Sequence, residues 1–449
     1  MPVIHAAAAL TSEGWRADAR LTVDRGTIAA VETDVAPRPG DERHAILVPA
    51  LANLHSHAFQ RGMAGLAERR GDHADTFWTW RETMYRFALA VSPDDVEALA
   101  AQLYVEMLEA GFAAVGEFHY LHNAPDGAPY AAPAEMATHI VAAAQATGIG
   151  LTLLPVFYAH ATFGGAPPKP EQRRFITDVD GFVRLLEDCR ALMAGFGPVG
   201  VAPHSLRAAT PAEIAAVVAL AGGGPIHIHA AEQVKEVEDC LVWSGARPVE
   251  WLLDHADVDA RWCLVHATHM TEDETLRLAR SGAVAGLCPI TEASLGDGVF
   301  NAPLYFSECG AFGVGSDSNV EIGVAAELKQ LEYAQRLRDR ARNVCALSAG
   351  STGRALYQRA LAGGAQALGR LSGALKVGAA ADLVSLRADH PTLAGRSGDE
   401  ILDAWIFAVG NPLVDCVWSG GRKVVADGRH LGRAPIVARF AAAMRRLAP

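Results

Sequence analysis

Lysine is scarce in this chain, and positive charge as a whole is outnumbered. The 449 residues include only five lysines, and the 39 Lys and Arg residues face 51 Asp and Glu, which gives a formal net charge of −12. A surface that binds nucleic acid needs concentrated positive charge. The composition therefore excludes nucleic acid as the expected partner.

Paired cysteine motifs and apolar targeting segments are also missing. The seven cysteines are odd in number, far apart and free of CxxC pairs, so we expect reduced thiols in a cytoplasmic protein. The apolar stretch at the amino terminus has no basic segment before it and soon meets Glu13 and Arg16, unlike a signal peptide. No apolar run of about 18 residues demands a membrane span, so we predict none.

The residues that are present favour a globular protein with a large core. Hydrophobic residues make up 50% of the chain and charged residues 20%. Short alternating stretches separated by turn residues occur between residues 3 and 48 and again between 381 and 425, a pattern typical of hairpins. We expect the two ends of the chain to close into one small β domain.

The middle of the chain has a different pattern, in which short continuous apolar runs alternate with longer helical segments. Such runs indicate parallel strands buried on both faces, and the segments 92–110 and 322–342 are examples of the predicted helices. The eight runs end near His55, Glu117, Phe157, Pro203, His229, His266, Cys288 and Asp317. Eight such units predict an α/β fold of the (β/α)8, TIM-barrel type.

Metal-binding residue types stand at the ends of four of these runs, where a barrel places its catalytic side chains. They are His55 and His57, His227 and His229, His266, and Asp317. Imidazoles and a carboxylate suit a borderline-soft divalent ion such as zinc, with a position left for water. For His227 we favour a structural role. Asp317 could instead cap a helix.

With these residues in this order, the chain resembles the amidohydrolase superfamily over essentially its whole length. The resemblance implies a distorted barrel at 49–372, flanked by a small β-sandwich domain made from 1–48 and from 373–449, with a terminal helix. It also implies metal ligation by His55, His57, His229 and Asp317. Binuclear members carry a lysine at the end of strand four, and none occurs in 199–204, so we expect one metal, Zn²⁺.

The implied chemistry is hydrolytic, because zinc lowers the pKa of a bound water to about 7 and makes hydroxide available for attack. His266 and Asp317 are expected to accept or orient the water proton. Glu232, in the pattern His-x-x-Glu, is expected to carry that proton to the leaving nitrogen. The alternative for Glu232 is that it merely begins a helix.

Five segments narrow the resemblance to one branch of the superfamily, which hydrolyses N-formimino-L-glutamate to N-formyl-L-glutamate and ammonia. They are 55–63, 116–122, 202–207, 265–269 and 288–298. The alternative is a deaminase or chlorohydrolase of the same superfamily that acts on a nucleobase, a nucleoside or another aromatic heterocycle. Thr291-Glu292 stands where those deaminases usually have Ser-Asn, which favours the formimino branch. A metal-free scaffold protein is disfavoured, since no expected ligand is missing.

The expected partners are a small dicarboxylate substrate and a second copy of the chain in a homodimer. A substrate with two carboxylates needs fixed positive charge, and the arginine fork binds carboxylate with two hydrogen bonds. The branch implies substrate contacts by Gln60, Arg81, Tyr120, His204 and Arg207. Arg81 could instead pair with Glu82, and Tyr120 could be a core aromatic.

Overall fold

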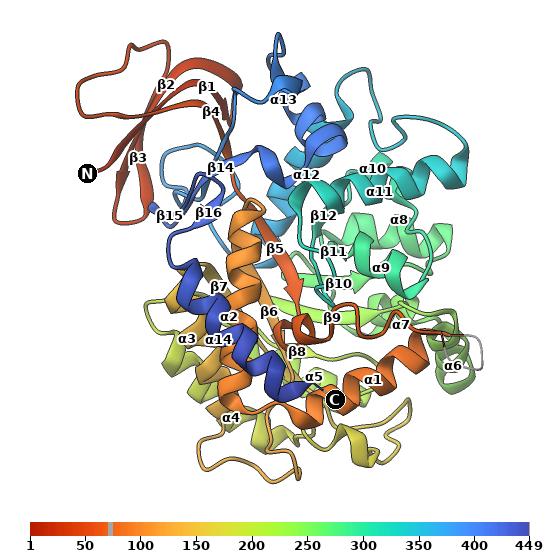
Figure 1. Cartoon of the computed structure of the whole chain (residues 1–449). Helices are drawn as coiled ribbons and strands as arrows, with labels where there is room; N and C mark the ends of the chain where they lie inside the picture. Colours follow the sequence, from red (N-terminus) through yellow and green to blue (C-terminus); the bar gives the residue numbers. More distant parts are fainter. Residues whose placement is uncertain (71–74, 449) are drawn as a thin grey trace.

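The computed structural model describes residues 1–70 and 75–448, so 71–74 and 449, which fall within the predicted barrel and terminal segments, lie outside the described residues. Eight parallel strands form the centre of the molecule (Figure 1). They are β5 (Leu51–Ser56), β6 (Phe112–His119), β7 (Gly150–Phe157), β8 (Ala202–Pro203), β9 (Ile226–Ala230), β10 (Trp262–His266), β11 (Val284–Leu287) and β12 (Ala311–Val314). The eight runs predicted from the sequence are thus confirmed as strands.

The barrel is built from two curved halves, which makes it distorted. Strands β5 to β8 form one four-stranded sheet, and β9 to β12 form the other. Only isolated bridges join the halves. Val201 pairs with Ile226 at one seam, and Ser56 pairs with Asp317 at the other. The regular backbone ladders of the barrel's described residues therefore lie within each half.

Helices cover the barrel, and their starts follow the capping signals in the sequence. The predicted helix at 92–110 is α2 (Pro93–Glu109), where the Ser92 side chain accepts a hydrogen bond from the Asp95 amide. The predicted helix at 322–342 is α11 (Val324–Asp339). The others around the barrel are α1 (Phe77–Ala90), α3 (Glu135–Thr147), α4 (Val179–Met193), α5 (Pro211–Leu220), α6 (Val234–Ser244), α7 (Pro248–His255), α8 (Glu272–Ser281), α9 (Pro289–Leu295), α10 (Ala302–Ser307) and α12 (Thr352–Ala367). Short helical turns are η1 (Ala58–Met63), η2 (Pro170–Gln172), η3 (Pro391–Leu393), η4 (Trp405–Val409) and η5 (Asn411–Leu413), and α13 (Asp399–Ala404) lies among the last three.

The two ends of the chain contribute strands to a single eight-stranded sheet, as predicted for the termini. The order is β16-β15-β14-β13-β4-β1-β2-β3, so the antiparallel pair β13–β4 joins the carboxyl-terminal strands to the amino-terminal ones. Its strands are β1 (Val3–Thr11), β2 (Gly14–Asp24), β3 (Thr27–Glu32), β4 (Glu42–Pro49), β13 (Leu383–Leu386), β14 (Val414–Ser419), β15 (Arg422–Ala426) and β16 (Arg429–His430). Ile4, Leu21, Leu383 and Trp418 belong to a core of its own.

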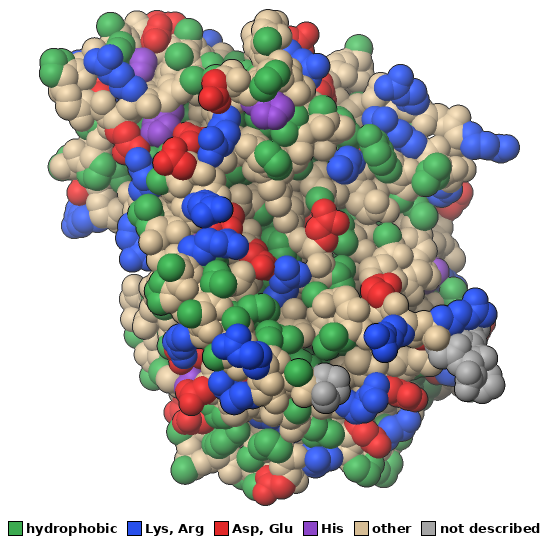
Figure 2. Space-filling view, in the orientation of Figure 1, with side chains coloured by type: hydrophobic (Ala, Val, Ile, Leu, Met, Phe, Trp, Pro, Cys, Tyr) green, Lys and Arg blue, Asp and Glu red, His purple; other side chains and the backbone are tan. Residues whose placement is uncertain are grey.

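The last helix leaves this sheet and returns to the barrel. Helix α14 (Arg433–Leu447) runs along α2 (Figure 1), where Arg439 and Arg446 form ion pairs with Glu97 and Asp95. Acidic and basic side chains intermingle over the face drawn in Figure 2. Within the described ranges, no helix has the length and apolarity that a membrane span requires.

Side-chain hydrogen bonds connect the ends of β5 and β12 at the seam between them. The Asn319 amide group donates to the carbonyl of His57 at 3.0 Å and accepts from the Ser316 hydroxyl at 2.6 Å. The Asn53 amide group in turn donates to the Ser316 hydroxyl at 2.7 Å. Because the seam has only one backbone bridge, this buried network fixes the relative position of the two strand ends.

Replacing Asn319 with alanine tests that role. Asn319→Ala removes buried hydrogen bonds and places alanine at φ = +60°, so we expect the free energy of unfolding to fall by about 2–4 kcal/mol. Urea denaturation measures this loss. The control is Asn301→Ala, since the Asn301 side chain makes no capping hydrogen bond. Equal stability of the two variants would contradict the role of the seam network.

Candidate metal centre and active site

Four side chains from three places in the barrel converge on one point. His55 and His57 lie at the end of β5, His229 lies on β9, and Asp317 follows β12. One ligand atom from each lies within 4.8 Å of all the others. The Nε2 atom of His55 is 3.2 Å from Nε2 of His57 and 3.1 Å from Nε2 of His229. The Asp317 Oδ1 atom lies 3.1 Å from the His57 Nε2 atom.

The hydrogen bonds behind the imidazoles show that this cluster fits a cation. The Nδ1 atoms of His57 and His229 donate to the carbonyls of Phe118 and His204, at 3.0 and 3.1 Å, so their Nε2 atoms carry the lone pairs. These lone pairs face one another, an arrangement that a bound cation makes favourable. Tetrahedral zinc, with bonds of ~2.0–2.1 Å, places its ligand atoms ~3.3 Å apart, close to the distances observed.

The surroundings hold these groups in the protonation states that bind metal. Burial lowers the pKa of His55 to about 3, and burial together with neighbouring histidines lowers the pKa of His229 well below its usual value. Burial would raise the pKa of Asp317, but the adjacent His55 and His57 side chains bring it well below the usual range. The site therefore offers neutral imidazoles and an ionised carboxylate.

His266 and Glu232 lie beside this cluster. The His266 Nε2 atom is 3.7 Å from Glu232 Oε1 and 3.8 Å from Asp317 Oδ2, and its Nδ1 atom is 3.4 Å from Glu292 Oε1. Burial would lower the pKa of His266, but the carboxylates around it raise the pKa to about 10. Burial raises the pKa of Glu232. A proton-holding imidazole and a carboxyl group of raised pKa thus stand side by side, as acid–base chemistry requires.

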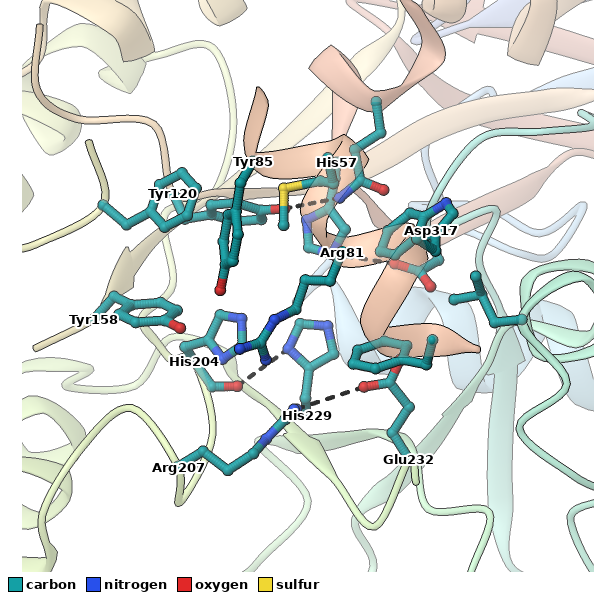
Figure 3. A pocket seen from close by; sticks show the side chains of 16 residues that line it. His57, Arg81, Tyr85, Tyr120, Tyr158, His204, Arg207, His229, Glu232 and Asp317 are labelled. Atoms are coloured by element: carbon teal, nitrogen blue, oxygen red, sulfur yellow. Dashed lines mark hydrogen bonds and ion pairs between the residues drawn. The ribbon is translucent and has the colours of Figure 1, made fainter. Parts of the chain in front are cut away.

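A pocket opens above the cluster and is lined by all five predicted substrate residues (Figure 3). Gln60 and Tyr120 lie on one wall, where the Gln60 amide donates to the Tyr120 hydroxyl at 2.7 Å. Tyr120 therefore reaches the pocket and is not only a core aromatic. Arg81 comes from α1, and Arg207 follows β8 beside His204. The pocket thus places two guanidinium groups near the metal cluster.

Arg81 and Arg207 both have N–H donors that remain available for a ligand. The buried Nε atom of Arg207 has no partner among the described residues, although its Nη2 atom lies 3.5 Å from Glu232 and 3.8 Å from Glu236. Arg81 lies 4.9 Å from the ring centroid of Trp78 and 5.3 Å from that of Tyr85. Within 1–70 and 75–448 it forms no ion pair, so the alternative pairing with Glu82 is absent there.

The structure also identifies residues in or beside the site that the sequence reasoning missed. Glu292 contacts His266, and Tyr85 and Tyr158 line the pocket. Tyr85 follows Arg81 by one helical turn on α1, a spacing that puts both on one face and could have suggested it. His227 has the structural role that we favoured, since its Nε2 atom donates to the Ala367 carbonyl at 2.7 Å.

Comparisons with known proteins agree with this geometry. Residues 46–424 match the model of the "Amidohydrolase family", and residues 1–45 match "Formimidoylglutamate deiminase HutF, N-terminal domain". A formimidoylglutamate deiminase of Pseudomonas aeruginosa is 51% identical and covers 96% of each chain. A 5-methylthioadenosine/S-adenosylhomocysteine deaminase of Natronomonas pharaonis is 27% identical over 92% of this chain and 89% of its own. The crystal structure of an amidohydrolase from Brucella melitensis has a TM-score of 0.97 at 55% identity, covering 100% of both chains.

The two histidines of β9 provide a direct test of the metal cluster. We expect His229→Asn to remove most of the bound divalent metal, because it removes an imidazole ligand. Elemental analysis of the purified, dialysed proteins measures the metal content. The control is His227→Asn two residues away, which should keep its metal because His227 faces the Ala367 carbonyl. Similar metal content in the two variants would contradict the assigned ligand set.

Proposed function

The chain belongs to the amidohydrolase family, in its formimidoylglutamate deiminase branch, and from this premise we propose the reaction and the role of each site residue. The proposed reaction is hydrolysis of N-formimino-L-glutamate to N-formyl-L-glutamate and ammonia. One observation carries this proposal. Two arginines with unused hydrogen-bonding capacity face a pocket beside a cluster of three histidines and an aspartate. Such a pocket suits a small dicarboxylate with a hydrolysable group at its inner end.

We assign the metal ligands as His55, His57, His229 and Asp317, with Zn²⁺ as the cofactor, since three imidazoles and one carboxylate suit this borderline-soft ion. When bound, the metal supplies a water of lowered pKa to the reaction. The segment before His204 contains no lysine, which supports a single metal.

The protein's own acid–base groups complete the reaction. We assign His266 to hold and orient the proton of the attacking water, helped by Asp317, because its Nε2 atom faces both Asp317 and Glu232. Glu232 then transfers that proton to the formimino nitrogen, which departs as ammonia when its bond to the formimino carbon breaks. The carboxylate of Glu292, on the other side of the His266 ring, keeps that ring in position.

The outer part of the pocket holds the substrate. We assign the two carboxylates to Arg81 and Arg207, whose planar guanidinium groups bind carboxylate with two hydrogen bonds. Gln60, Tyr120 and His204 line the space between these arginines and the metal ligands. A neutral heterocycle would bring no carboxylate to Arg81 or to the Nε–H of Arg207, which is unpartnered among the described residues, and this disfavours the nucleobase alternative.

Two wider predictions accompany this function. All seven cysteines are free thiols, which supports the predicted cytoplasmic location. The predicted homodimer is a separate expectation, and light scattering on the purified protein measures it.

Substitution of Glu232 tests the acid–base assignment. We expect Glu232→Gln to keep its metal and lower kcat by about 10²–10⁴-fold, because the amide cannot transfer the proton. Ammonia release and metal analysis on the same preparation measure both quantities. The control is Glu238→Gln on the exposed face of α6, which should retain full activity. Retained turnover in Glu232→Gln would remove Glu232 from the mechanism.

Substrate comparison tests the arginine assignment. We expect kcat/KM for N-formimino-L-glutamate to exceed that for N-formimino-2-aminobutyrate, which lacks the side-chain carboxylate, by about 100-fold. Guanine and adenosine should release no ammonia above background. Equal rates with and without the carboxylate would remove the roles of Arg81 and Arg207, and turnover of the purines alone would establish the heterocycle alternative.

A further inference from the structure

Two tyrosine hydroxyls face the substrate pocket from different elements. Tyr85 lies on α1, and Tyr158 immediately follows β7. Figure 3 shows both hydroxyl groups on the side of the pocket where the Arg81 guanidinium and the His204 ring lie. The Tyr158 ring packs against the His204 ring, with centroids 4.6 Å apart. Neither tyrosine belongs to the acid–base or metal-binding groups assigned above.

A buried glutamine holds both hydroxyl groups from behind. Gln172, at the end of η2, is completely buried. Its Nε2 atom donates to the Tyr158 hydroxyl at 2.7 Å and to the Tyr85 hydroxyl at 3.3 Å. The Lys169 backbone amide donates to Gln172 Oε1 at 2.7 Å. Since a backbone N–H can only donate, the glutamine oxygen must face Lys169 and the NH₂ group must face the tyrosines.

This arrangement determines where the tyrosine hydrogens can point. Each hydroxyl oxygen already accepts a hydrogen from Gln172, so its own hydrogen has to find an acceptor elsewhere. Burial raises the pKa of Tyr158, so the phenol keeps its hydrogen and remains a donor. The neighbouring pocket groups Arg81 and Arg207 carry only donors. Tyr85 and Tyr158 also lie close enough to interact with each other, and a ligand carboxylate would offer both hydroxyls a stronger, charged acceptor.

The segment that carries Gln172 is also fixed to the helix that carries Tyr85. Arg174, which is fully buried, donates to the carbonyls of Ala88 and Val91 at the end of α1, at 2.6 and 2.7 Å. Its Nε atom donates to the Asn123 carbonyl at 2.8 Å. The loop after β7 and helix α1 are thus locked together. The glutamine and both tyrosines therefore form one rigid unit on the wall of the pocket.

We propose that Tyr85 and Tyr158 determine specificity by donating their hydroxyl hydrogens to a carboxylate of the substrate, and that Gln172 is the positioning residue that sets this direction. The inference deepens the proposed function and rests on it for the identity of the dicarboxylate. A carboxylate has about four acceptor sites, and an arginine fork fills two of them. Neutral phenol donors fill the remaining sites without adding a third positive charge. The pocket would thereby favour a carboxylate over a neutral group of similar size.

The test measures binding and turnover separately in metal-loaded protein. We expect Tyr85→Phe and Tyr158→Phe each to raise the dissociation constant of glutarate, a dicarboxylate probe, about tenfold in calorimetry, since each loses a hydrogen bond to a charged group. KM for N-formimino-L-glutamate should rise by a similar factor, while kcat stays within about twofold, because the hydroxyls contact the non-reacting end. The matched control is Tyr333→Phe on α11, which lies outside the pocket and should change neither constant.

Substitution of Gln172 tests the direction of the hydrogen bonds. Gln172→Glu keeps the shape of the side chain but replaces the donor NH₂ group by an acceptor oxygen, which draws the tyrosine hydrogens away from the pocket. We expect its glutarate dissociation constant to rise at least as much as in Tyr158→Phe. The increase should be smaller when Gln172→Glu is made in the double phenylalanine variant, because the tyrosines transmit part of the effect.

The outcomes separate this inference from the proposed function. If the wild-type protein releases no ammonia from N-formimino-L-glutamate but binds glutarate in a manner that depends on the tyrosines, the proposed function fails and the specificity role stands. If the wild-type protein is active but both phenylalanine variants bind glutarate within twofold of it, the specificity role is wrong. Absence of glutarate binding by the wild-type protein would also overturn it. A fall in kcat without a change in KM would mean that the tyrosines act on the chemistry and not on binding.

Discussion

The convergence of three imidazole lone pairs on one point is the constraint on which the rest of the structure depends. Their Nε2 atoms lie 3.1–3.2 Å apart, close to the ligand spacing around a tetrahedral cation. His55 belongs to one half of the barrel and His229 to the other. The proposed ligands therefore come from both half-barrels, which isolated bridges join among the described residues. At the seam between β5 and β12, a buried hydrogen-bond network of Asn53, Ser316 and Asn319 connects the two halves.

The charged groups around the pocket lie in two places. Carboxylates surround His266 on the inner side, and the Arg207 guanidinium faces the substrate space. These carboxylates raise the pKa of His266 to about 10, which keeps a proton close to the metal ligands. Arg207 faces Glu232 and Glu236 at 3.5 and 3.8 Å, distances longer than those of a tight ion pair. The guanidinium group is thus held in place without being neutralised. It retains the capacity to bind an incoming carboxylate, while the acid–base groups on the inner side remain available to the reacting carbon and nitrogen.

The sequence predicted the strands and the cluster of metal-binding residues because both depend on local patterns. Buried parallel strands are continuous apolar runs, and where a run ends in a polar residue, as at His55 and Asp317, that residue marks the catalytic edge of the barrel. The positions of Gln172 and Glu292 could not be predicted in this way. Each acts through contacts with distant elements, Gln172 with Tyr85 on α1 and Glu292 with His266 on β10, and such contacts leave no periodic signal in the chain. The packing of the terminal helix on α2 could not be predicted from the sequence either, because it depends on ion pairs between residues more than 300 positions apart.

Strand ends and the segments that follow them carry different parts of the site. The strand ends hold the metal ligands and His266, whose positions must be accurate because ligand distances tolerate little error. The groups that face the outer pocket come from α1 and from the segments after β7 and β8, which are not bound by these distances. A barrel with the same ligands could therefore accept a different substrate through changes in those segments alone. In this chain, buried Arg174 and Gln172 connect the loop after β7 to α1 by hydrogen bonds, so these two parts of the substrate-binding wall are held together.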